Sequence, residues 1–505
     1  MSRLRVYARN LLASWVGYGV NLVVMFFLSP FVVHQLGSVA YGIWSLLISI
    51  SGFLSLAELG VGGGLGQYLN YHLARREIKR VNTVINTSLV FFFMSGLIML
   101  LCVGGVSFLF ASVFKNVPES YLPAIRMSMF LIGFQLWISF FYATFNQILS
   151  AIDRFDLQNV VKIMSIFLQA CGTVFVLRAG GGIVGLAVIQ LLSGFVGMLV
   201  TVVLVRRVFP EFSLRPASAR LECFREMFGF SLWAFVGKIA FRMLYWMDIV
   251  LIGILLTPRH VAYYSIAAML IMHARGFVIQ SSFILTPQIV KDCALRNWDA
   301  LQNIFSRGST MVMAIGIPMF VGFVVFGKEF ISLWMGREYV ISYQILAILS
   351  LAQLPSIASA LTGSVFSGLH KIHIDAGFTV LQCLLNLIFT VLFVSVFKMG
   401  LAGVAWGTFF PRVGVSLLAL FVAVRMAKLS WREFVNTVLW RWVILLAAFW
   451  VICLCLDAVV IKGGWFSFSV KVAAASMIYA GLVWQGLMSN LERKETLSLV
   501  FSQAA

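Results

Sequence analysis

The sequence predicts an all-α polytopic membrane protein with about 14 transmembrane helices. Of its 505 residues, 61% are hydrophobic and 11% are charged, and the mean hydropathy is +0.99. Apolar runs long enough to cross a bilayer, which takes about 20 residues, recur along the whole chain. The 37 lysines and arginines fall mostly in short segments between these runs. These observations exclude a soluble domain. Because the basic residues lie in loops that set membrane topology, the pI of about 9.9 does not indicate a nucleic-acid partner.

Fourteen apolar runs are candidate transmembrane helices. In chain order they are 8–33, 41–69, 84–111, 122–150, 158–178, 183–205, 228–256, 261–289, 305–327, 340–368, 375–397, 401–424, 434–457 and 466–489. Several exceed 25 residues, so we expect them to tilt or to extend past the lipid.

The basic residues between the runs predict the orientation of the chain. One set of alternating connections contains 24 lysines and arginines, and the other set contains 9, with Lys471 counted among them. Because cytoplasmic loops carry the excess of positive charge, both termini are expected in the cytoplasm, which agrees with an even number of spans.

Three short motifs recur in the same order, 217 to 222 residues apart. The pairs are Val39–Gly42 with Val261–Tyr264, Ser150–Phe155 with Ser367–Ile372, and Gly182–Ala187 with Gly400–Ala405. A repeated unit of six spans keeps its orientation, so the two copies are expected to be related by a pseudo-twofold axis along the membrane normal. A cleft between the two lobes would then hold the substrate.

The repeat divides the chain into four predicted parts. They are an N-terminal six-helix lobe (1–205), a cytoplasmic inter-lobe loop (206–227), a C-terminal six-helix lobe (228–424), and two additional helices with a short tail (425–505).

Four cations lie well inside the predicted spans, where charge is costly and commonly marks a substrate pathway. They are Lys238, Arg242, Arg275 and Arg412. They outnumber the two acids found at such depth, Glu58 and Asp248. This excess of positive charge predicts an anionic substrate, and an acid-rich cavity for cationic drugs is disfavoured.

Lys238, Arg242 and Tyr245 are spaced i, i+4 and i+7, so they share one stripe of a helix. A ladder of cations suits a diphosphate, whose oxygens accept charge-assisted hydrogen bonds. The alternative is an ion pair between helices, or, for Lys238, a side chain that reaches to the membrane surface.

Arg275 lies near the middle of its span, and we expect it to face the cavity. Arg412 follows Pro411, so it is either a cavity cation beside a hinge or a side chain that binds the carbonyl groups freed by the proline. Asp248 and Glu58 either neutralise buried cations or carry a coupling proton or Na⁺. The glycines from Gly60 to Gly66 predict close helix packing or a break in the helix.

Several of these stretches resemble a known family. Leu56–Gly62 places an acid before a glycine pair, Arg242–Gly253 carries a mid-helix Asp followed by Gly, and Leu36–Gly42 and Gly400–Ala405 also fit. Together with twelve repeated spans plus two, they resemble the polysaccharide branch, the O-antigen (Wzx-type) flippases, of the multidrug/oligosaccharidyl-lipid/polysaccharide exporter superfamily.

The resemblance implies a flippase of the bacterial inner (plasma) membrane that acts in lipopolysaccharide or related polysaccharide biosynthesis. Its substrate would be a polyprenyl-diphosphate-linked glycan, moved from the inner to the outer leaflet by alternating access. Membrane lipids surround it, and a polysaccharide polymerase and chain-length machinery are candidate partners. The alternatives within the superfamily are a lipid II flippase and a cation-coupled multidrug exporter.

The sequence gives no reason to expect an enzyme or a cofactor. It contains no nucleotide-binding loop, no catalytic triad and no Cys or His spacing that predicts a metal site. A membrane-embedded glycosyltransferase or polymerase is disfavoured because the predicted outer loops are too short for an acidic catalytic site.

Overall fold

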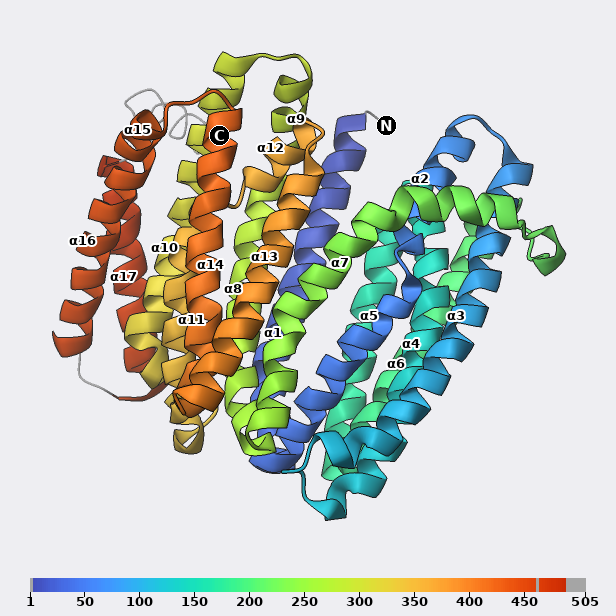
Figure 1. Ribbon diagram of the computed structural model, residues 1–505, viewed down its shortest axis with the longest axis horizontal. Coiled ribbons are helices and arrows are strands. Elements are labelled where there is room, and N and C mark those ends of the chain that lie inside the picture. The colour runs from blue at the N-terminus through green and yellow to red at the C-terminus, as the bar shows by residue number, and fades with distance from the viewer. Residues whose placement is uncertain (1–2, 460–462, 487–505) are drawn as a thin grey trace. The chain divides into compact units, whose positions relative to one another are not determined.

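The computed structural model describes residues 3–459 and 463–486, and in this part of the chain every regular element is a helix (Figure 1). Twelve of the described segments are long and apolar enough to cross a membrane. The expected fourteen is therefore approximate: one segment joins the first two predicted spans, and α7 (Leu221–Leu255) is not among the twelve. The prediction of an all-α polytopic membrane protein is confirmed.

The chain divides into two compact units, residues 1–265 and 266–505, and the division falls within α8 (Pro258–Phe283). The other helices of the first unit are α1 (Arg3–Leu54), α2 (Val61–Ala74), α3 (Ile78–Val113), α4 (Leu122–Ala151), α5 (Phe155–Arg178), α6 (Gly182–Val208) and α7, with short turns η1 (Ser55–Glu58), η2 (Glu119–Tyr121) and η3 (Pro216–Ser218).

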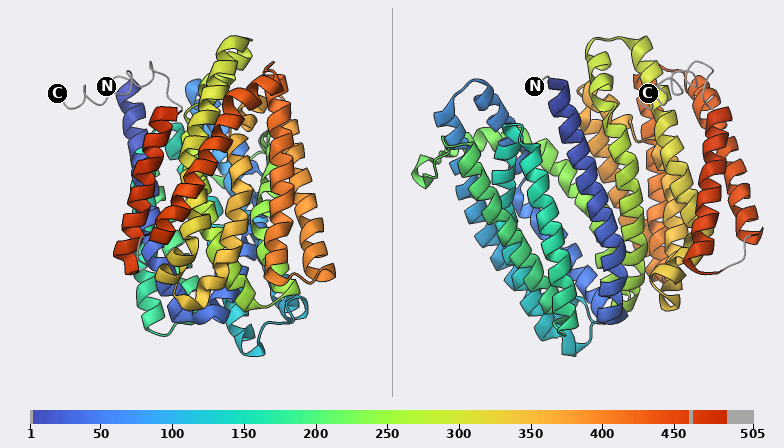
Figure 2. Two further views of the ribbon diagram at one scale, coloured as in Figure 1. Left: turned by 90° about the vertical axis from the view of Figure 1, so that its left-hand side faces the viewer. Right: turned by 180° about the vertical axis from the view of Figure 1, so that it is seen from behind.

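The second unit continues from α8. It contains α9 (Thr286–Ala294), α10 (Trp298–Trp334), η4 (Arg337–Val340), α11 (Ile341–Ala358), α12 (Thr362–Gly368), α13 (Ile372–Val391), η5 (Leu392–Val396), α14 (Gly400–Met426), α15 (Trp431–Phe434), η6 (Val435–Leu439), α16 (Trp440–Val459) and α17 (Gly464–Gly486). Figures 1 and 2 show α16 and α17 together at one edge of this unit, where both pack on α10.

Two breaks interrupt the helical path from α1 to α2. The first lies within α1 at Gly37, whose φ of 73° is accessible to glycine and costly for most other residues. The second follows η1, where Leu59 and Gly60 adopt left-handed conformations before α2 begins. The predicted span 41–69 is therefore the second part of α1, then η1, then α2, and the expected break at the glycines occurs.

The repeated motifs adopt the same backbone conformation in both copies. Gly182 (φ 54°) begins α6 and Gly400 (φ 58°) begins α14. In the second motif pair, the left-handed residues are Asp153 (φ 58°) and His370 (φ 57°), each just after a helix end. In both, the next amide donates to the carbonyl five residues earlier, at 2.8 Å and 2.7 Å. This hydrogen bond is characteristic of a Schellman helix stop.

A third pair of turns obeys the same offset without a recognisable sequence motif. Arg76 (φ 58°) lies between α2 and α3, and Arg296 (φ 55°) lies between α9 and α10. The two positions are 220 residues apart. The internal repeat is therefore present in backbone geometry as well as in sequence.

The connection between the repeats is fixed along α3 by side chains. Asn82 donates to the carbonyl of Glu211 and accepts from the amide of Ser213, both at 2.9 Å. One turn later, Asn86 donates to the carbonyl of Ser213 at 2.9 Å and accepts from the amide of Arg215 at 2.8 Å. Two asparagines on one face of α3 thus form the hydrogen bonds with this extended backbone that a neighbouring strand would otherwise form.

Candidate functional site

The predicted cations lie on three helices. Arg242 on α7 and Arg275 on α8 are partly buried, and Arg412 on α14 is 5% exposed. Counted at 1.5 Å per residue from their helix starts, they lie about 32, 26 and 18 Å along. Each is therefore far from the ends of its helix. Arg242 belongs to the first unit, and Arg275 and Arg412 belong to the second.

Two further predicted residues lie on α7. Tyr245 is partly buried, one turn after Arg242. The backbone of Lys238 is helical, but its side chain lies outside the described part of the structure. The predicted stripe of Lys238, Arg242 and Tyr245 therefore stays a prediction.

Asp248 lies on α7, buried to 4% exposure, and Tyr264 on α8 donates its hydroxyl to the carboxylate at 2.6 Å. A hydrogen bond to an ionised carboxylate is stronger than one between neutral groups. The bond joins the two helices of the α7–α8 hairpin. Tyr264 ends the second copy of the Val-Ala-Tyr motif, where the first copy has Gly42.

At the position that matches Tyr264, the first motif copy has Gly42, which allows a close backbone approach. A Cβ at Gly42 would collide with the carbonyl of Pro258, at the start of α8. Nearby, Asn116 donates to the carbonyl of Leu256 at 2.5 Å. The turn between α7 and α8 is thus held against α1 and the connection after α3, and only glycine permits the approach at Gly42.

Glu58 lies at the break between η1 and α2. Its carboxylate accepts the amide hydrogen of Gly62 at 3.1 Å, in the first turn of α2. A carboxylate at this place satisfies one amide left over at a helix start and interacts favourably with the helix dipole. Glu58 therefore has a structural contact with the start of α2, whether or not it also takes part in transport.

The end of α2 and the turn that follows it carry a histidine–glutamate contact outside the membrane-spanning segments. The Nδ1 atom of His72 lies 2.7 Å from the Oε2 atom of Glu77, and Arg75 stacks on the ring of Tyr71. The hydrogen bond from His72 lowers the pKa of the Glu77 carboxyl below its usual value, and Arg80 nearby adds to the effect.

Lys471 was predicted to be a loop cation, and this prediction is wrong. Lys471 lies inside α17 with no exposed surface. Its ammonium donates to Glu329 of α10 at 2.7 Å and to Asp457 of α16 at 3.0 Å. A signal was available: Asp457 is an acid in the last turn of an apolar run, and an acid at such a place commonly pairs with a cation.

Comparison with known proteins gives an independent result. Residues 33–344 match the family described as polysaccharide biosynthesis protein. A protein of Haloferax volcanii described as a probable low-salt glycan biosynthesis flippase, Agl15, is 28% identical over 184 residues. That match covers 36% of this chain and 39% of the Haloferax protein, so it spans well under half of either.

Two solved structures have similar folds. The lipid II flippase MurJ in an inward closed conformation aligns with a TM-score of 0.74 and 13% identity, over 95% of this chain and 100% of that one. An inward-facing multidrug resistance MATE family transporter of the MOP superfamily aligns with a TM-score of 0.70 and 16% identity, over 81% of this chain and 98% of that one. At these identities the likeness concerns the fold alone.

Proposed function

Because the chain belongs to the polysaccharide biosynthesis protein family, in the polysaccharide flippase branch of the multidrug/oligosaccharidyl-lipid/polysaccharide exporter superfamily, we propose that it moves a polyprenyl-diphosphate-linked oligosaccharide across the membrane. The direction is from the inner to the outer leaflet of the plasma membrane, with both termini in the cytoplasm. An O-antigen or similar repeat unit fits this proposal. A polysaccharide polymerase and chain-length machinery would then act on the product.

The observation that carries the chemistry of the substrate is the arginine content of the repeat helices. Arg242, Arg275 and Arg412 lie deep in α7, α8 and α14. A diphosphate is a compact anion that a guanidinium binds through two parallel hydrogen bonds. We assign Arg275 and Arg242 to the diphosphate, and Lys238, Arg412 and Tyr245 to the same substrate.

The proposed transport cycle is alternating access between the two repeats. The contacts of Gly42 with Pro258 and of Asn116 with Leu256 join the α7–α8 turn to α1 and to the connection after α3.

The role of Asp248 follows from its contact with Tyr264. We propose that this carboxylate either fixes the α7–α8 hairpin or takes up a coupling ion when the hydrogen bond breaks. Glu58, whose carboxylate binds the start of α2, is proposed mainly as a structural residue.

The experiment that tests the function is lipid mass spectrometry of cells depleted of this protein. Accumulation of polyprenyl diphosphate carrying a short oligosaccharide would support the proposal and would identify the sugars. Accumulation of lipid II would assign the protein to peptidoglycan synthesis. If no lipid-linked intermediate accumulates and sensitivity to cationic drugs rises, the multidrug exporter is the better assignment.

A further inference from the structure

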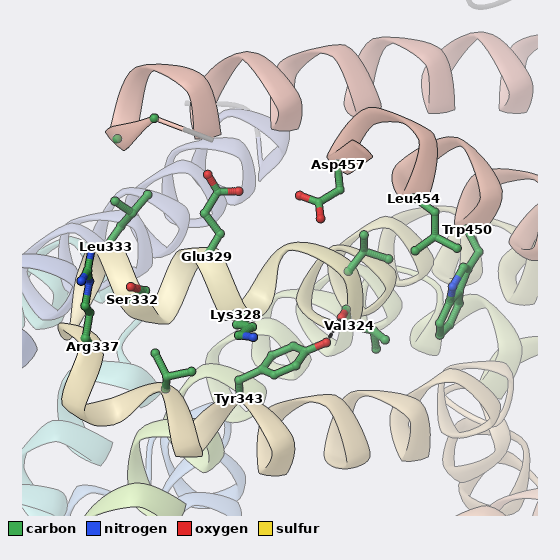
Figure 3. A pocket seen from close by; sticks show the side chains of 14 residues that line it. Val324, Lys328, Glu329, Ser332, Leu333, Arg337, Tyr343, Trp450, Leu454 and Asp457 are labelled. Atoms are coloured by element: carbon green, nitrogen blue, oxygen red, sulfur yellow. Dashed lines mark hydrogen bonds between the residues drawn. The ribbon is translucent and has the colours of Figure 1, made fainter. Parts of the chain in front are cut away.

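A cavity of about 720 Å³ lies in the second unit, apart from the arginines assigned to transport. It is formed by the last turns of α10, by η4, by the first turn of α11 and by the end of α16 (Figure 3). Its lining combines charged residues with apolar side chains, among them Val324, Leu333, Trp450 and Leu454. Such a lining suits a ligand that has one polar and one apolar end.

The position of the cavity along α10 corresponds to the level of lipid headgroups. Lys328 lies 30 residues after Trp298, the first residue of α10, which is about 45 Å along the helix axis. A bilayer with its headgroups is about 40–45 Å thick. Trp334 and Trp465 both pack on Phe330 close by, and tryptophan is enriched at this membrane level.

Two cations of the cavity lining are exposed, whereas both of its acids are already paired. Glu329 and Asp457 both form ion pairs with Lys471, which has no exposed surface. Lys328 and Arg337 are exposed residues of the same lining. Figure 3 shows the two carboxylates facing each other on one side and the Lys328 ammonium on the other. Lys328 and Arg337 are therefore the cations that a ligand in this cavity would meet.

One stripe of α16 leads from the charged end of the cavity into the membrane. Trp450, Leu454 and Asp457 are spaced i, i+4 and i+7, so they share a face. Trp450 lies about 10 Å deeper than Asp457. Leu454 is 51% exposed and Trp450 is partly exposed, so both are accessible to an acyl chain.

We propose that this cavity binds an anionic phospholipid of the surrounding membrane. Its phosphate lies between Lys328 and Arg337, and Tyr343 and Ser332 lie within the same lining. The Tyr343 hydroxyl donates to the carbonyl of Val324 at 2.7 Å, which leaves its oxygen able to accept a hydrogen bond from the headgroup. One acyl chain follows Trp450 and Leu454. The bound lipid would join α10 to α16, on the side of the fold where Lys471 also joins them.

Native mass spectrometry of the full-length protein in detergent tests this proposal. The probes are dioleoylphosphatidylglycerol, which is anionic, and dioleoylphosphatidylcholine, which is zwitterionic. We expect the wild type to retain phosphatidylglycerol preferentially. The double variant Lys328→Gln, Arg337→Gln should weaken that binding about tenfold or more, since it removes charge-assisted hydrogen bonds to phosphate. The matched control is Lys398→Gln, another exposed lysine of this unit that does not line the cavity.

A second variant tests the apolar part of the site. Leu454→Trp keeps all the charges and fills the acyl path, so it should also reduce retention of phosphatidylglycerol. The proposal is overturned if the double variant binds phosphatidylglycerol like the wild type, or if Lys398→Gln loses as much. It is also overturned if inorganic phosphate displaces the lipid completely and Leu454→Trp has no effect, because the cavity would then be a site for small anions.

Discussion

Lys471 and Arg275 are both cations inside membrane-length helices of the second unit, and their surroundings differ. Lys471 lies on α17, outside the repeat, with no exposed surface and with two carboxylates within 3.0 Å. Arg275 lies on α8, inside the repeat, and is partly exposed. Both side chains lie within membrane-length helices, so this placement alone does not identify a substrate site. Exposure separates the ion cluster of Lys471 from Arg275, a candidate binding group.

The difference has an energetic basis. Removing a charge from water costs several kcal/mol, and attraction to a partner offsets this only when the geometry is good and the remaining hydrogen bonds are made. Lys471 fulfils this condition with carboxylates from two other helices. A cation that serves a transported anion must instead remain accessible to it. We therefore expect substitutions at the two positions to fail in different ways, Lys471 in stability and Arg275 in transport.

The largest expected effect belongs to Arg275. Arg275→Glu should reduce transport at least about 100-fold, because it removes a bidentate cation and places a repelling charge against the phosphate. Arg275→Lys should retain part of the activity, since it keeps the charge and loses the paired hydrogen bonds. Transport is measured as appearance of lipid-linked glycan in the outer leaflet, normalised to the amount of folded protein.

The matched control is Lys291→Glu, which makes the same charge reversal at an exposed position of α9. Normal transport by Arg275→Glu at normal protein levels would remove Arg275 from the proposed site. Equal loss in both variants would point to a general effect of charge on insertion.

Lys471→Met gives the next largest effect. It leaves Glu329 and Asp457 without their shared cation, so the free energy of unfolding should fall by about 3–5 kcal/mol. The triple variant Lys471→Met, Glu329→Gln, Asp457→Asn should recover most of that loss, because no unpaired charge remains. Thermal unfolding of purified protein measures both. A variant that is as stable as the wild type but inactive in transport would contradict the distinction drawn between Lys471 and Arg275.

Much of the fold could be predicted from the sequence, since lipid requires every backbone group to be satisfied within a helix. The length of the apolar runs predicted the spans, and the repeated motifs predicted a six-span unit used twice. The structure adds that the turns at Asp153 and His370 share a left-handed conformation.

Contacts between distant segments were beyond this kind of prediction. Asn82 and Asn86 bind backbone groups 127 to 131 residues away, and nothing in their local sequence indicates those partners. Lys471 was misassigned because it is close to the start of its run, where a loop lysine is also expected. The candidate arginines could be located by depth alone, while the groups around them depend on how helices pack.

Tyr264→Phe tests an intermediate case, a buried acid held by a neutral donor. Loss of the hydroxyl removes a bond to a buried carboxylate and should lower the free energy of unfolding by about 1–3 kcal/mol. Tyr263→Phe is a natural control, because the hydroxyl of Tyr263 accepts from Arg259, an exposed residue, and its loss should cost less than about 1 kcal/mol. If both substitutions lower the free energy of unfolding equally, burial of Asp248 does not strengthen its hydrogen bond with Tyr264.

The smallest effect is expected from Glu77, whose charge pair with His72 lies outside the membrane-spanning segments. The pKa of Glu77 is lowered from its ordinary value of 4.5 by the hydrogen bond from His72, so the ionised form is favoured in the folded protein. The stabilisation is therefore fully present above pH 4.5 and is lost as the pH falls through the lowered pKa. The difference in unfolding midpoint between wild type and Glu77→Gln should shrink as the pH falls below 4.5. A difference that grows below pH 4.5 would reverse the assigned direction. Glu77 is in contact with water. The loss of stability caused by Glu77→Gln is therefore the reference with which the larger loss caused by Lys471→Met is compared.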